Sequence, residues 1–407
     1  MWQFNYGEWT EAYVFLRLLG NGRIYAADKN FERDLNVYMD ILNVIRYEKD
    51  HILEFQREME NINAKDNGIS FRMLTCGELN EKADYLYDTI KNITSNDRKF
   101  SVPEIESYLS ELKFSQPKVP KLPKEIENTY GKKTDIIITI QDSSDHATST
   151  TGFSIKSHLG SASTLFNSST ASKFLYEIVG CTENEMHLIN GKYINSELGM
   201  FDYIKNNPDL SLSFCGTSEE FNNNLDFIEL KMPEILSCAI LTQIGYYDRA
   251  STSKTRDITE KVAQINPVGV KRPEIWYEAK MKDFLYASFS GLTASEPWDG
   301  RKKLSGGYID VATNGEMLYY RAVSDDIFNT FLYEHTFFDR PSRGVNKDRA
   351  KIIAGAYLEN RSIDSEELLA ATTKNGKPKS KKGDWGYVFK GDDGKFYISV
   401  NFQISFV

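Results

Sequence analysis

Two short β-branched segments near the middle of the chain hold the residues best suited to chemistry. They read TDIIITI at 134–140 and FSIKS at 153–157, and both are typical of strands. We assume that they pair as an antiparallel hairpin with residue 140 opposite residue 153, so that opposed side chains share one face of the sheet. That face then carries a carboxylate, a hydroxyl, an ammonium and an imidazole: Asp135, Ser154, Lys156 and His158. A slip of one residue would separate the carboxylate from the ammonium.

A carboxylate beside an ammonium on rigid strands suits the metal-dependent hydrolysis of phosphodiester bonds. This reaction needs a cation that neutralises the phosphate, a deprotonated water molecule and a stabilised leaving oxygen. Carboxylate oxygens are ligands that Mg²⁺ prefers. A lysine beside the metal can lower the pKa of the water and stabilise the charged transition state. Asp135 and Lys156 therefore predict a Mg²⁺-dependent site that acts on phosphodiesters.

The same residues carry a family resemblance. The pattern TDIIITI…GFSIKS resembles the PD-(D/E)xK nuclease signature in its SxK variant, in which serine replaces the second acid. The longer string FSIKSHLGSASTLFNSSTASKF resembles HpaII-type restriction endonucleases. The opening GEWTEAYVFLRLLGNGRIYAAD and the closing YISVNFQISF are also similar to the ends of those enzymes. The resemblance implies a type II restriction endonuclease in which Asp135 is the invariant acid, Ser154 the replaced acid and Lys156 the catalytic lysine.

The serine at 154 leaves one metal ligand to be found elsewhere. In nucleases of the SxK variant the missing carboxylate can come from the following helix, and Glu177 in ASKFLYEIVG is the candidate there. Nucleases of this fold also bring a glutamate from an N-terminal helix, and Glu8 and Glu11 lie three residues apart on one helical face. We therefore expect the metal to be held by Asp135 with Glu177 or Glu11. Either glutamate could instead be an ordinary solvated residue.

Two further segments could contact DNA. The stretch 158–173 is rich in small and hydroxyl residues, and a phosphate cradle would use Gly160, Ser161 and Ser163. The alternative is an ordinary turn that ends in a helix cap. Base readout needs side chains such as Arg, Asn and Lys, and the loop 337–349 offers four of them: Arg340, Arg343, Asn346 and Lys347. The alternative for this loop is simple solvation.

The elements that must position these residues follow from periodicity. The apolar spacing predicts helices over 8–19, 32–62, 78–93, 103–112, 168–179 and most of 216–248. The proline- and lysine-rich stretch 115–133 is typical of an extended connector. Further strands are expected at 306–311, 317–323 and 387–390, and a GDDG turn leads into the alternating segment 395–406. There Asn401 and Gln403 lie on the polar face and could meet DNA or solvent.

These elements predict a mixed α/β fold. The resemblance implies a PD-(D/E)xK nuclease core, with a central mixed sheet flanked by helices. We expect a helical N-terminal region at 1–115, the nuclease core at 116–260 and a mixed C-terminal region at 261–407. The last region would serve DNA recognition and dimer support.

Composition sets looser bounds. The net charge of the 407 residues is −9, which slightly opposes a polyanionic partner, although a DNA-binding cleft needs only a local basic face. The four cysteines form no CxxC pair and the five histidines show no HxxxH spacing, so a zinc or histidine-rich site is not expected. The chain lacks a signal-like start and an apolar run long enough to cross a membrane. We therefore expect a cytoplasmic protein with no membrane partner.

The leading hypothesis is a Mg²⁺-dependent type II endonuclease that acts as a homodimer on double-stranded DNA. A two-fold dimer reads a two-fold site, so the target should be short and palindromic, and the resemblance suggests a CCGG-like sequence. A cognate DNA methyltransferase would be a functional partner without implied contact. The alternatives are a repair or structure-specific nuclease of the same fold, a DNA-binding protein whose nuclease site has decayed, and a function unrelated to nucleic acids.

Overall fold

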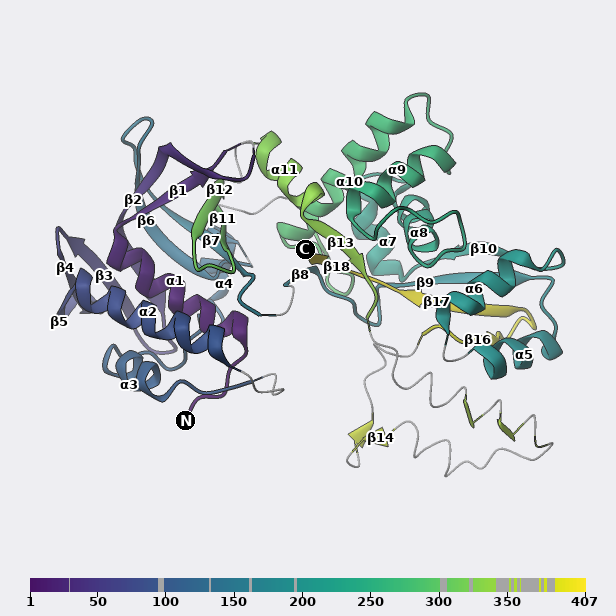
Figure 1. The fold of residues 1–407 in the computed structure, drawn as a ribbon, viewed down its shortest axis with the longest axis horizontal. Helices are drawn as coiled ribbons and strands as arrows, with labels where there is room; N and C mark the ends of the chain where they lie inside the picture. Colours follow the sequence, from purple (N-terminus) through teal and green to yellow (C-terminus); the bar gives the residue numbers. More distant parts are fainter. Residues whose placement is uncertain are drawn as a thin grey trace. The chain divides into compact units, whose positions relative to one another are not determined.

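The computed structural model divides the chain into two compact units, each described here by itself. Unit 1 comprises Met1–Ser163 and Lys302–Phe331, and unit 2 comprises Thr164–Arg301 and Leu332–Val407. The structure describes residues 1–28, 30–93, 99–131, 133–160, 163–193, 196–300, 306–321, 325–341, 351–352, 355–356, 359, 373–374, 377–378 and 385–407. Helices and strands alternate through both units, which confirms the predicted mixed α/β class (Figure 1).

Unit 1 is built on one mixed sheet. Within the described residues its strand order is β1-β12-β11-β7-β6-β2-β3-β4-β5, and β1 also pairs with β2, so that six of the strands close into a ring. The β1–β12 and β11–β7 pairs are parallel and the others are antiparallel. The strands are β1 (Arg23–Ala27), β2 (Arg33–Tyr47), β3 (Ile52–Glu58), β4 (Asn61–Asp66), β5 (Ile69–Thr75), β6 (Ile136–Asp142), β7 (Thr148–Ser157), β11 (Gly307–Val311) and β12 (Met317–Arg321).

The helices of this unit are α1 (Tyr6–Asn21), α2 (Cys76–Asn92), α3 (Pro103–Glu111) and α4 (Lys124–Tyr130). The first starts at Tyr6 because Asn5 and Glu8 form a capping box, with reciprocal backbone-to-side-chain hydrogen bonds of 2.9 Å. It stops at Gly22, whose φ of 69° suits glycine and whose N–H donates to the Leu18 carbonyl. The helix predicted over 8–19 is therefore confirmed, and it extends two residues further at each end.

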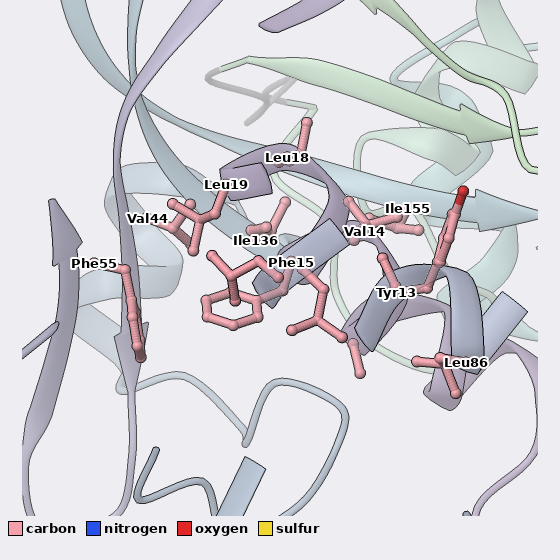
Figure 2. Close-up of a cluster of buried hydrophobic side chains, with 14 of the residues drawn as sticks. Tyr13, Val14, Phe15, Leu18, Leu19, Val44, Phe55, Leu86, Ile136 and Ile155 are labelled. Carbon is pink, nitrogen blue, oxygen red and sulfur yellow. The ribbon is translucent and has the colours of Figure 1, made fainter. Parts of the chain in front are cut away.

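The core of unit 1 lies around α1. This helix packs against α2 and against strands of the sheet, including β7 (Figure 1). Figure 2 shows its side chains between Val44, Ile136 and Ile155 of the sheet and Leu86 of α2. Because α1 is covered on both sides, it is a rigid element, and any polar residue near its N-terminal end is held in a fixed place relative to β7.

The described part of unit 2 contains two small antiparallel sheets, one two-stranded antiparallel pair and a group of helices. Its sheets have the orders β10-β9-β17-β16 and β13-β18-β8 within the described residues. The strands are β8 (Thr164–Phe166), β9 (Lys173–Val179), β10 (Ser211–Gly216), β13 (Thr336–Asp339), β16 (Val388–Lys390), β17 (Phe396–Asn401) and β18 (Gln403–Phe406); β14 (Thr373–Lys374) pairs with β15 (Lys377–Pro378). The helices are α5 (Glu183–Tyr193), α6 (Glu197–Asn206), α7 (Glu219–Asp226), α8 (Met232–Gln243), α9 (Thr255–Ile265) and α10 (Pro273–Phe289), while α11 (Asp325–Glu334) crosses the boundary between the units.

The helix predicted over 32–62 is wrong, because this stretch forms strands β2 and β3 and the first two residues of β4. The register of β2 against β6 shifts between Ile41 and Asn43. The buried residues of β2 before and after this irregularity, Ile41 and Val44, are therefore three apart. Such spacing imitates a helix in a segment that is a bulged strand.

The helix predicted over 168–179 is also wrong, since Lys173–Val179 forms β9. Phe174, Tyr176 and Ile178 alternate along it as buried residues, with the aromatic and β-branched types that strands favour. The closing segment 395–406 does alternate as predicted, but it divides into β17 and β18, which belong to different sheets. Asn401 is only 1% exposed, and it bonds to Ser172 rather than facing solvent.

The connector predicted over 115–133 is extended only in part, because α4 occupies Lys124–Tyr130.

None of the helices in the described ranges is both long and apolar enough for a membrane span.

Candidate active site

Asp135 lies at the base of the β6–β7 hairpin, where the two strands begin to diverge. Its backbone N–H donates to the Phe153 carbonyl at 2.8 Å. Its carboxylate oxygen Oδ2 accepts two hydrogen bonds from β7, one from the Ser154 hydroxyl at 3.0 Å and one from the Ile155 N–H at 2.8 Å. The carboxylate is thus fixed by the neighbouring strand, and Ser154 serves to hold it in place.

The hairpin register differs from the assumed one without changing its chemical consequence. Residue 153 lies opposite 136 and not 140, a displacement of four residues along β6. Side chains alternate between faces with a period of two, so an even displacement keeps every residue on its predicted face. The predicted meeting of Asp135 with Ser154 is therefore present, although the assumed pairing of 135 with 158 is wrong.

Lys156 lies on β7, two residues after Ser154, and its side chain is half-buried. Burial lowers its pKa, while the negative charges of Asp135 and Glu11 oppose that change. For Asp135, burial raises the pKa, against the effects of the Lys156 ammonium and of the hydrogen bonds from β7. Lys156 is thus weakly solvated and close enough to both carboxylates for their negative charges to act on its pKa.

Lys133 adds a second cation that the sequence analysis did not single out. Burial and the positive charge of Lys156 lower the pKa of Lys133 to about 7. It lies two residues before Asp135, in the turn that precedes β6. The same alternation that groups Ser154 with Lys156 could have drawn attention to it.

Glu11 is the second carboxylate of this site. A hydrogen bond between the hydroxyls of Thr10 and Ser157, at 2.8 Å, ties α1 to the end of β7. Burial and the negative charge of Asp135 raise the pKa of Glu11 well above its ordinary value. The Val119 N–H donates to the Glu11 carboxylate at 2.8 Å. Glu8, the other predicted glutamate of α1, instead caps the helix and pairs with Lys118.

Glu177 has different surroundings from those expected. It lies on β9 of unit 2 and not on a helix, opposite Ser213 and Tyr397 in the sheet. Its carboxylate forms an ion pair with Lys395 at 2.8 Å. Among the predicted glutamates, Glu11 shares unit 1 with Asp135, and the negative charge of Asp135 raises the pKa of Glu11.

The donor set of the site fits a hard divalent cation. No group of three or more His, Cys, Asp or Glu side chains that could hold a metal occurs in the described ranges. Asp135 and Glu11 nevertheless supply two carboxylates that are close enough for the charge of Asp135 to raise the pKa of Glu11. Mg²⁺ keeps several water molecules and is commonly bound through one or two carboxylates. A cation of this kind would relieve the repulsion between the two acids.

The predicted neighbour His158 is oriented by the next strand of the sheet. Its Nε2 lies 2.9 Å from Asp310 Oδ1, and the Tyr308 hydroxyl donates to the same oxygen at 2.5 Å. In the parallel β11–β7 pair Asp310 lies beside Lys156. The imidazole is thus held by β11 at the edge of the site.

The residues predicted to contact DNA lie in several places. Gly160 is exposed and follows β7 closely, with Tyr6 packed so near that an added Cβ would come within 2.6 Å of it. Ser163 is half-buried, and Arg340 is exposed at the end of β13. Ser161, Arg343, Asn346 and Lys347 lie outside the described residues.

A cleft of about 790 Å³ in unit 1 involves other residues altogether. Three of its lining arginines are paired with acids, Arg17 with Asp84, Arg23 with Asp40 and Arg33 with Glu316. Neither Asp135 nor Lys156 lines it. This cleft is therefore a different place in unit 1 from the Glu11, Asp135 and Lys156 cluster.

The parts of the chain that hold this cluster, α1 and the β6–β7 hairpin, are similar to known proteins. A sequence model of the HpaII restriction endonuclease family matches residues 5–353. The Type II restriction enzyme HpaII of Haemophilus parainfluenzae is 34% identical over 345 residues, which cover 83% of this chain and 90% of that enzyme. No solved structure matches the chain. The range matched by the family includes α1 and the β6–β7 hairpin, and hence all three residues of the cluster.

Proposed function

We propose that this chain, which belongs to the HpaII restriction endonuclease family, hydrolyses phosphodiester bonds at a short palindromic site in double-stranded DNA with Mg²⁺. As a member of this family it is a type II site-specific endonuclease. The observation that carries the proposed mechanism is the meeting of Asp135, Glu11 and Lys156 in one weakly solvated site.

Asp135 and Glu11 would hold the Mg²⁺ ion. When bound, the ion supplies charge neutralisation for the phosphate and activation of the attacking water. The Ser154 hydroxyl and the Ile155 N–H keep the Asp135 carboxylate in place. Glu11 is preferred over Glu177 because it shares a unit with Asp135 and responds to its charge.

Lys156 would act on the phosphate and on the attacking water. Its ammonium, on the rigid strand β7, stabilises the negative charge that grows on the phosphoryl oxygens. Because burial lowers its pKa, the amine gives up a proton more readily than a solvated lysine does. Lys133 adds positive charge near the same place.

Two segments of the chain are proposed to contact DNA. Gly160, Ser161 and Ser163 come directly after β7, and we assign them to backbone phosphates near the cleaved bond. We assign base readout to Arg340, Arg343, Asn346 and Lys347, and the first target to test is CCGG. A homodimer would present two such sites to the two strands of a palindrome, and a cognate methyltransferase would protect the host DNA.

Digestion of plasmid DNA tests this function. Purified protein with Mg²⁺ should give discrete fragments, and removal of the metal by EDTA should stop cleavage. A ladder without preferred ends would favour a repair or structure-specific nuclease. Sequence-specific binding in Ca²⁺ without cleavage in Mg²⁺ or Mn²⁺ would show a DNA-binding protein whose nuclease site has decayed.

A further inference from the structure

Arg46, near the end of β2, and Glu48, just after it, form a buried ion pair. This pair lies close to the segment whose Val119 N–H donates to Glu11. The side chains of Arg46 and Glu48 are only 5% and 2% exposed, and Arg46 Nε lies 2.6 Å from Glu48 Oε1. The ring of Phe114 lies 3.9 Å from the guanidinium. Burial of two charges is unfavourable unless further hydrogen bonds satisfy them. The remaining partners of the pair therefore show which part of the chain it holds.

Those partners all belong to the extended segment that follows α3. Arg46 Nη2 donates to the backbone carbonyls of Gln116 at 2.7 Å and Lys118 at 2.6 Å. The Ser115 hydroxyl donates to the second oxygen of Glu48 at 2.5 Å. The ion pair thus binds the segment through its backbone, and side-chain variation there would leave most of these contacts unchanged.

The peptide group between Lys118 and Val119 joins this ion pair to the catalytic cluster. Its carbonyl accepts from Arg46 at 2.6 Å, and its N–H donates to Glu11 Oε2 at 2.8 Å. This peptide, like the others in the described part of the chain, is trans, so its C=O and N–H point in opposite directions. Fixing the carbonyl therefore fixes the direction of the N–H that reaches Glu11.

We propose that Arg46 is a positioning residue for DNA cleavage, which orients the Glu11 carboxylate toward Asp135 through the 118–119 peptide group. This inference rests on the proposed function, because the ligand role of Glu11 is part of that proposal. A carbonyl polarised by a guanidinium also makes its peptide N–H a better donor. The positive charge of Arg46 further opposes the rise in the pKa of Glu11 that burial and Asp135 cause.

The decisive variant is Val119→Pro, which removes the N–H while leaving both ion-pair residues in place. The next residue is already proline, which biases Val119 toward the β and polyproline regions, and the second of these is one that a proline adopts. Val119→Ala is the matched comparison, because it also loses the side chain but keeps the N–H. The difference between the two variants isolates the donor to Glu11.

Metal binding is measured on the full chain with Tb³⁺, a hard cation whose emission is excited by nearby aromatic residues. Trp9 and Tyr6 on α1 are suitable donors. Loss of a hydrogen bond to a charged group should weaken Tb³⁺ binding about tenfold in Val119→Pro relative to Val119→Ala. The Mg²⁺ concentration for half-maximal cleavage should rise by a similar factor, while the rate at saturating Mg²⁺ falls less.

Glu11→Gln separates this inference from the proposed function. If Glu11→Gln weakens Tb³⁺ binding and folded Val119→Pro does not, the positioning role is overturned and the metal assignment stands. If Glu11→Gln leaves both Tb³⁺ binding and cleavage unchanged, the assignment of Glu11 as a ligand fails.

Arg46→Lys provides a second test for the case in which Val119→Pro does not fold. Lysine keeps the charge beside Glu48 but cannot span two carbonyls and a carboxylate with the geometry of a guanidinium. We expect weaker Tb³⁺ binding and a higher Mg²⁺ requirement. Unchanged values for both in a folded Arg46→Lys protein would refute the role of Arg46.

Discussion

Replacing Lys156 by alanine should remove catalysis while leaving DNA binding in place. The side chain is half-buried, and the negative charges of Asp135 and Glu11 act on its ammonium. Removal of one preorganised group that stabilises developing charge costs about 3–4 kcal/mol of transition-state stabilisation. At about 1.4 kcal/mol for each factor of ten, the cleavage rate should fall at least 100-fold.

The assay is single-turnover cleavage of a labelled duplex at saturating Mg²⁺, with binding measured separately in Ca²⁺. Lys156→Arg serves as the matched variant, because it keeps the charge but cannot give up a proton. Partial activity in Lys156→Arg would indicate a purely electrostatic role, and inactivity would indicate proton transfer or a strict steric fit. Cleavage by Lys156→Ala within threefold of the unaltered enzyme would refute the assignment.

Three further predictions concern the carboxylates. Ser154→Ala loses one of the two hydrogen bonds that hold Asp135, so cleavage should fall about tenfold; a loss above 1,000-fold would mean that Ser154 does more than position. Glu11→Gln should abolish cleavage in Mg²⁺ while Glu177→Gln, which breaks only the ion pair with Lys395, should not, and the reverse result would assign the metal to Glu177. Because the pKa of Glu11 in the folded chain is raised above its ordinary 4.5, this carboxyl contributes stability below about pH 4.5 that is lost as pH rises through its folded value. Thermal unfolding without metal should therefore show Glu11→Gln to be more stable than the unaltered enzyme at neutral pH, and an equal or lower unfolding temperature would contradict the burial of this charge.

The placement of Asp135 on the same face as the SxK residues of β7 could be predicted from the sequence. Side chains alternate between the two faces of a strand, so an error of an even number of residues in the register leaves each residue on its predicted face. The hairpin is displaced by four residues from the assumed register, yet both residues stay on the expected face. The helix α1 could also be predicted from the sequence, since its cap residues and apolar spacing are local signals.

The surroundings of Glu11 could not be predicted in the same way. Its partner Val119 is 108 residues away, and the contact depends on a backbone N–H that carries no side-chain signal. Arg46 lies in a stretch that the sequence pattern assigned to a charged helix, because the irregularity in β2 disturbs the alternation of a strand. A buried arginine cannot be told from a solvated one when the type of element is wrong.

For Glu177, by contrast, the sequence does carry a local signal of the surrounding structure. The alternation of Phe174, Tyr176 and Ile178 is a local strand signal, which places Glu177 on the other face of β9. The prediction of a helix over 168–179 from apolar spacing disregarded that signal. Residue alternation was here the better guide to the surroundings of the glutamate.

The central claim is that the Glu11, Asp135 and Lys156 cluster cuts DNA at a defined site with a divalent metal. The most direct test digests a library of genomic DNA with Mg²⁺ and sequences every new end, with Asp135→Asn as the control protein. All ends should fall within one short palindromic sequence, and Asp135→Asn should produce none. Ends spread over unrelated sequences, or unchanged cutting by Asp135→Asn, would contradict it.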